Sequence, residues 1–141
     1  MIESLYALLA KVGFTHPLHP ALTHIPMGMV MGCFFFGFLV WYAKKTDFQK
    51  TCLHCSVLAL IFIGPTIIAG IFDWQHLYAG RYQALIIIKM ILAAVLTGLL
   101  GYSIWLHRHG AEPKKIFIIY ALCLVCAVGL GFSGGQLVYS N

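Results

Sequence analysis

Charged residues are scarce in this sequence. Only 9% of its 141 residues are charged, and 61% are hydrophobic. Soluble globular domains are roughly a quarter charged and about half apolar, so the scarcity of charge excludes a water-soluble fold. The net charge of +5 does not indicate a nucleic-acid-binding protein, because most of the basic residues fall in two short connections between apolar segments.

The sequence also lacks any segment left over for a sheet or a soluble enzyme domain. It contains four apolar stretches, each about 22 residues long, and about 20 helical residues cross a hydrocarbon core of roughly 30 Å. Lipid requires every backbone polar group to be bonded within its segment, which favours helices. The sequence therefore predicts an all-α fold, an integral membrane four-helix bundle forming a single domain over residues 1–141. The expected spans are residues 21–43, 53–74, 84–106 and 116–138.

The N-terminus has no basic region and no small-residue cleavage site, so we do not expect a conventional signal peptide. Apolar residues recur at helical spacing over residues 2–12, while Glu3 and Lys11 lie off the apolar face. This pattern predicts a short interfacial helix lying on the membrane surface. Gly13 is expected to end it.

Basic residues set the expected orientation. Residues 44–50 contain three lysines and residues 108–115 contain Arg108 and two more lysines, against Lys11 and Arg81 on the other side. Cytoplasmic connections carry the excess of lysine and arginine. We therefore expect a multi-pass protein of the bacterial inner membrane, in contact with the lipid bilayer, with both termini on the periplasmic side.

This topology gathers polar residues of distant segments at the outer ends of the helices. Charged groups inside a bilayer are costly and are often functional. Asp73 and Lys89 both lie near helix ends, so two interpretations stay open: they belong to a site, or they reach the interface or pair with each other. The outer-end residues are His16, His19, His24, Asp73, His76, Arg81, Gln83, Lys89, Ser133, Gln136 and Tyr139.

Two of these histidines suggest a haem site. His24 lies about one turn inside the first span, and His76 reaches a similar depth on the second. Two imidazoles on facing helices of a bundle can bind a haem iron axially. We expect haem b, with His24 and His76 as the iron ligands, His19 hydrogen-bonding or substituting, and Met31 or Met90 as the alternative sixth ligand. The remaining predicted cofactor residues are Arg81, for the propionates, and Trp74, Gly134 and Gly135, for the slot.

Two other metal sites remain open. His54 and His107 lie at the cytoplasmic boundary at similar depth, where they would hold a second haem or simply face solvent. His16, His19 and His24 offer imidazoles to zinc or copper. Prolines at positions 17 and 20 break any regular geometry among these three.

The cysteines are expected to pack helices. Cys52 and Cys55 are followed by Ser56, so they do not form the motif that attaches haem covalently. Cys123 and Cys126 lie deeper in the fourth span. Small, slightly polar residues of this kind are common at membrane helix contacts.

Three stretches, "HPALTHIPMGM", "GIFDWQH" and "GFSGGQLVYS", resemble a bacterial family of four-helix membrane domains of unknown function. The family pattern is HP-x-L-V-H-F-P, then D-W after the second helix, then G-G-x-L-V-Y, and the resemblance runs from His19 to Tyr139. This sequence departs from the pattern at Thr23, at Ile25, and at Gln83, near which many members have a histidine. On the motifs, the resemblance carries over His19, His24, Asp73, Trp74, Gly134, Gly135 and Tyr139.

The resemblance also implies a function. Members occur beside Rieske or cytochrome modules, which implies electron transfer. We therefore expect a membrane b-type cytochrome or haem-bearing subunit that passes electrons between quinol and a periplasmic cytochrome or Rieske protein. It would be a subunit rather than a free-standing enzyme, and an oligomer stays open. The alternatives are a cofactor-free anchor or assembly subunit of a redox complex, and a metal-binding membrane protein.

Overall fold

The computed structural model describes residues 2–13, 16–78, 80 and 84–139. The described chain is almost entirely helical and contains no strand, which confirms the predicted all-α membrane fold. The elements in order are α1 (Ile2–Lys11), α2 (Leu18–Trp41), the 3-10 helix η1 (Thr46–Phe48), α3 (Gln49–Tyr78), α4 (Ala84–Arg108) and α5 (Pro113–Tyr139).

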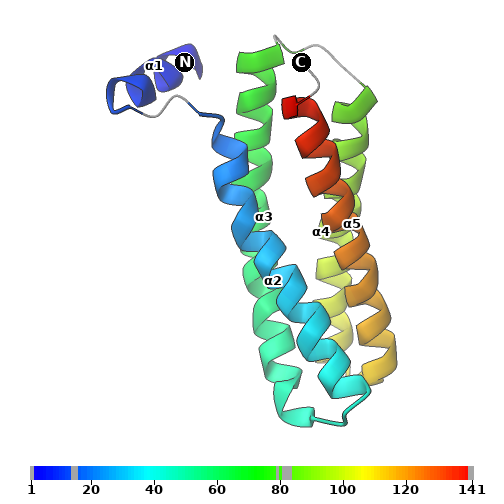
Figure 1. Ribbon diagram of the computed structural model, residues 1–141. Helices are drawn as coiled ribbons and strands as arrows, with labels where there is room; N and C mark the ends of the chain where they lie inside the picture. Colours follow the sequence, from blue (N-terminus) through cyan, green and yellow to red (C-terminus); the bar gives the residue numbers. More distant parts are fainter. Residues whose placement is uncertain (1, 14–15, 79, 81–83, 140–141) are drawn as a thin grey trace.

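The four long helices run up and down in an antiparallel bundle (Figure 1). Helix α2 packs against α3 and α5, and α4 packs against the same two helices, so the order around the bundle is α2, α3, α4, α5. The connections at residues 42–48 and 109–112 lie at one end of the bundle. Helix α1 and the last turns of α5 lie at the opposite end, which we call the outer end.

All four long helices are long and apolar enough to cross a membrane. Helix α3 has 30 residues, which at about 1.5 Å per residue exceeds the hydrocarbon thickness of roughly 30 Å. Part of α3 therefore extends into the headgroup region, where it meets α1. Helix α2 begins at Leu18, earlier than the apolar pattern indicates. Pro20 is tolerated in its first turn, because no intrahelical hydrogen bond is needed there.

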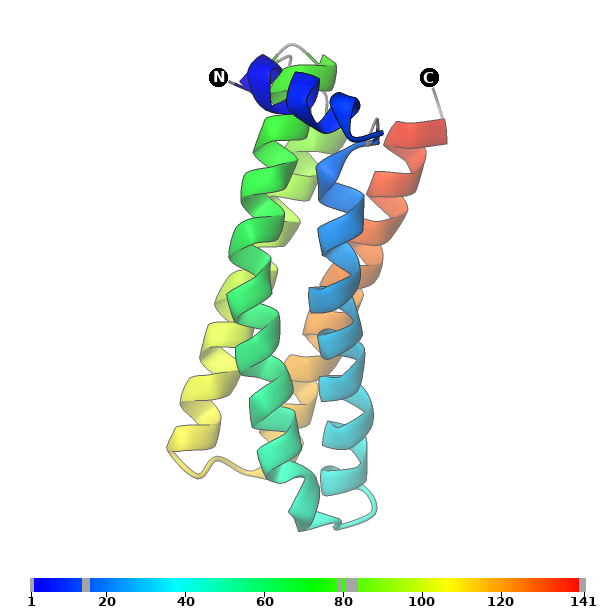
Figure 2. The same ribbon diagram turned by 90° about the vertical axis from the view of Figure 1, so that its left-hand side faces the viewer.

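Helix α1 lies across the outer end of the bundle, at a steep angle to the long helices (Figure 2). Leu8 of α1 and Val12, directly after the helix, are 61% and 76% exposed. They are therefore available to the membrane interface, as expected for an interfacial helix. The opposite, polar side of α1 faces α3.

The interior of the bundle contains two apolar clusters, one at mid-depth around Leu100 and one toward the inner end around Tyr120. All five cysteines are free, and four of them are buried within these clusters. Their burial favours the packing role expected from the sequence, because a free buried cysteine behaves as a small hydrophobe.

Candidate functional site

A buried carboxylate joins three helices at the outer end. Asp73 of α3 is only 7% exposed. Its Oδ1 accepts the backbone N–H of Leu18 at 3.0 Å, and its Oδ2 accepts that of His19 at 2.8 Å. The Tyr6 hydroxyl of α1 also donates to Oδ1. Asp73 therefore does not reach out to the interface, because three protein donors hold its carboxylate inside.

Asp73 caps the first turn of α2 from a neighbouring helix. The first backbone N–H groups of a helix lack intrahelical partners, and Pro17, at the capping position of α2, supplies no side-chain hydrogen bond. The carboxylate of Asp73 takes the first two of these N–H groups, and Pro20 has none to offer. A negative charge at this position also stabilises the helix dipole. Thr23 takes no part in this cap, because its hydroxyl donates to the His19 carbonyl at 2.6 Å.

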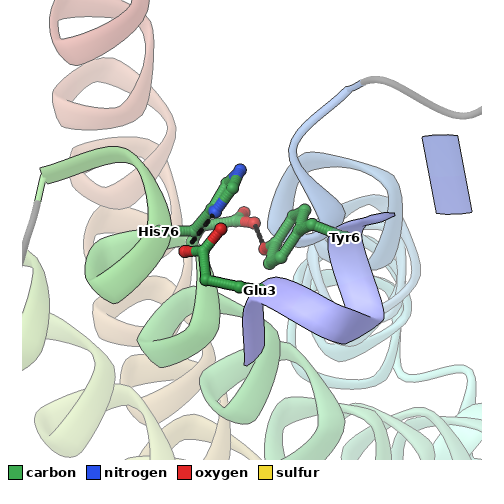
Figure 3. Close-up of polar contacts among 4 residues, drawn as sticks. Glu3, Tyr6 and His76 are labelled. Carbon is green, nitrogen blue, oxygen red and sulfur yellow. Dashed lines mark hydrogen bonds and ion pairs between the residues drawn. The ribbon is translucent and has the colours of Figure 1, made fainter. Parts of the chain in front are cut away.

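Two more contacts fasten α1 to α3 beside this carboxylate. The Nδ1 of His76 lies 2.9 Å from the Oε1 of Glu3 (Figure 3). The His76 and Tyr6 rings stack in parallel, with centroids 4.0 Å apart. Burial, followed by the hydrogen bond to Asp73 and its charge, raises the pKa of Tyr6 well above its usual value. The Tyr6 hydroxyl therefore remains a donor throughout the physiological pH range.

This raised pKa predicts how docking of α1 depends on pH. Because the docked state disfavours tyrosinate, docking is at full strength below the ordinary tyrosine pKa of about 10 and weakens as the pH rises beyond it. Spin labels at Leu8 and Leu77, which are both exposed, should keep a constant separation from pH 7 to 9 and lengthen above about pH 10. In Tyr6→Phe the alkaline step should vanish. An unchanged step would assign it to another group.

His19 is held against α3 in one orientation. Its Nδ1 lies 2.9 Å from the backbone carbonyl of Thr66. Because a carbonyl only accepts, Nδ1 carries the proton, and Nε2 is left with its lone pair. A Cβ at Gly70 would lie 3.0 Å from the Nδ1 of His19, so the glycine permits this close approach. Neither Gly70 nor Thr66 was singled out by the sequence.

A lysine side chain lies near Asp73 and His19. The half-buried Lys89 of α4 acts electrostatically on both Asp73 and His19. It forms no direct ion pair with Asp73 among the described contacts. Its Nζ lies 3.7 Å from the position that a Cβ at Gly134 of α5 would occupy. The outer end therefore contains an anion, a cation and an imidazole contributed by three helices, supported by a glycine of the fourth.

The two predicted haem ligands, His24 and His76, do not belong to this group of side chains. His24 is exposed on α2, and no polar side chain among the described residues binds it. His76 is half-buried and is engaged by Glu3 and Tyr6. The described side chains thus show no contact between His24 and His76, and His19 is the outer-end histidine that packs between two long helices.

The other predicted outer residues are placed as follows. Trp74 is half-buried on α3, His16 is exposed before α2, and Met31 and Met90 are 46% and 42% exposed. Arg81 and Gln83 lie outside the described residues, as do the side-chain surroundings at Gly135, Gln136 and Tyr139. Within the described part of the chain, no three His, Cys, Asp or Glu side chains are grouped so as to hold a metal ion.

The inner end contains a separate buried network. Nε2 of His107 lies 2.7 Å from the hydroxyl of Tyr120, which in turn accepts from Ser56 at 3.0 Å. Ser103 approaches Ser56 at 3.4 Å. His54, by contrast, is exposed on α3 and lines a surface groove. His54 and His107 therefore face different surroundings, one the surface and the other the interior.

The fold and this outer end define a multi-pass α-helical membrane protein. The chain belongs to the family described as predicted membrane protein (DUF2231), whose sequence profile matches residues 15–141. This confirms the resemblance to a membrane domain family of unknown function. No curated protein and no solved structure matches the chain.

Proposed function

We propose that this protein is a membrane electron-transfer subunit that binds haem b near its outer end, where His19 would hold the iron. The proposal keeps the expected chemistry and moves the ligand from His24 to His19. When bound, haem b would supply one-electron transfer between ferric and ferrous iron. The donor class would be quinol, and the acceptor a periplasmic cytochrome or Rieske protein.

The orientation of His19 is the observation that carries the proposal. Metal-binding histidines typically donate their other ring N–H to a carbonyl or carboxylate, which fixes the ring and directs the free nitrogen at the metal. His19 has this arrangement, with Nδ1 at the Thr66 carbonyl and no partner on Nε2 among the described residues. Because the Thr66 carbonyl holds the proton on Nδ1, the neutral imidazole already has an unprotonated Nε2. No further group is needed to remove a proton from that nitrogen.

The surrounding charges suit an anionic cofactor. Lys89 is a half-buried ammonium beside Gly134, so it offers a cation for a propionate in the place expected for Arg81. Asp73 holds the backbone N–H of His19 and so fixes the start of α2. His24 would not hold a haem inside the bundle, because its side chain is exposed on α2.

The haem content of two matched variants tests the proposal. The purified wild-type protein should give a pyridine haemochrome spectrum of the b type, His19→Ala should lose most of the haem, and His24→Ala should retain it. Both changes remove one imidazole from the same helix, so they control for each other. A haem-free wild-type protein would contradict the proposal. So would loss of haem in His24→Ala but not in His19→Ala.

A membrane anchor or assembly subunit is the second candidate, and the attachment of α1 favours it. Glu3 and Tyr6 fix α1 to α3 at defined positions, whereas a helix that only floats on lipid needs no such bonds. The result would be a rigid outer surface on which a redox partner docks. A colourless wild-type protein would leave this candidate standing.

A further inference from the structure

A groove on the bundle surface at the inner end is not used by the site described above. It is lined by Leu53, His54, Val57 and Leu58 of α3, and by Arg108 at the end of α4. Its volume is about 340 Å³, the size range of small-molecule sites in proteins. The groove lies at the ends of α3 and α4, two adjacent helices that are long and apolar enough to cross a membrane, so a lipid of the surrounding bilayer has access to it.

The groove combines an apolar wall with a basic rim. Leu53, Val57 and Leu58 form the apolar part, and Leu58 is 42% exposed. Arg108 and His54 are both exposed within it. A guanidinium presents a planar fork of donors that binds a phosphate through two hydrogen bonds, and an imidazole can add a third. Among the residues that the structure describes, no acidic one lines the groove.

We propose that this groove is a binding site for an anionic phospholipid, with its phosphate at Arg108 and His54 and the start of an acyl chain along Leu53, Val57 and Leu58. Basic pockets between membrane helices on the cytoplasmic side bind anionic headgroups in this way. The apolar wall selects a lipid over free phosphate, because phosphate alone would leave that wall uncovered. The basic residues at this end, Lys44, Lys45, Lys50, Lys114 and Lys115, predict that it faces the cytoplasmic, anionic leaflet.

Lipid retention measured by native mass spectrometry tests this site. The full-length protein is released from micelles containing equal amounts of phosphatidylglycerol and phosphatidylcholine. Wild type should retain phosphatidylglycerol preferentially. Arg108→Gln should lower that retention about fivefold, the effect of one basic residue at an anionic surface. Leu58→Trp should lower it similarly without any change of charge, because the indole fills the groove.

Lys114→Gln is the matched control, since Lys114 is exposed at the same end but lies outside the groove. It should leave retention within about a factor of two of wild type. Equal losses in Lys114→Gln and Arg108→Gln would mean diffuse attraction and overturn the proposal. So would full retention in Leu58→Trp, or displacement of the lipid by millimolar inorganic phosphate.

Discussion

Asp73→Ala is expected to free α1 from the bundle and to destabilise the protein by about 3–5 kcal/mol, the cost of removing one partner from a buried charged network. The substitution leaves the N–H groups of Leu18 and His19 and the hydroxyl of Tyr6 without their acceptor. It also leaves the Lys89 ammonium without the nearby charge that stabilises it.

Asp73→Asn separates these effects. The amide keeps one acceptor oxygen, so we expect about half of the loss, from the missing charge and the missing second acceptor. Asp47→Ala is the control, because Asp47 is exposed in η1 and should change stability by less than about 0.5 kcal/mol. Reversible unfolding in micelles gives the stability, and the Leu8–Leu77 spin-label distance gives the docking of α1. Normal stability in Asp73→Ala would remove Asp73 from the centre of this network.

The fold could be predicted because it depends on composition. Four apolar stretches of membrane length leave few alternatives to four helices, and the structure contains these four helices. The site could be predicted only in part. Depth along a helix follows from residue counting, which correctly brought Asp73 and His76 to the outer end. Rotation about the helix axis does not follow, because in an apolar span no polar face marks the interior.

His24 and His19 illustrate this limit. Both are near the start of α2, yet His24 is exposed and His19 packs against Gly70. Gly70 was the signal available in the sequence, since a glycine in an apolar helix often marks a close approach. The role of Tyr6 was hidden for a different reason. Its partner Asp73 is 67 residues away, and the apolar periodicity of residues 2–12 describes only the lipid-facing side of α1.

The second large effect is expected at the inner end, in Gly37→Ala. A Cβ at Gly37 would lie 2.8 Å from Cδ2 of the Tyr120 ring, closer than carbon atoms pack. Tyr120 is fully buried and bound to His107 and Ser56, so its ring cannot move without straining those hydrogen bonds. Overpacking of a close-packed interior costs about 1–3 kcal/mol, and we expect Gly37→Ala at the upper end of that range.

Gly98→Ala is the matched control, because Gly98 is also inside a long helix and a Cβ there would meet nothing within 4 Å. It should be neutral or stabilising by up to about 1 kcal/mol, since alanine is the better helix former. Tyr120→Phe keeps the ring and removes only the hydroxyl, so it measures the hydrogen bonds alone, at about 0.6 kcal/mol each in membrane proteins. A larger loss in Gly37→Ala than in Tyr120→Phe means that contact between α2 and α5, more than the polar network, holds the inner end together. The reverse order would make the network the main source of stability there.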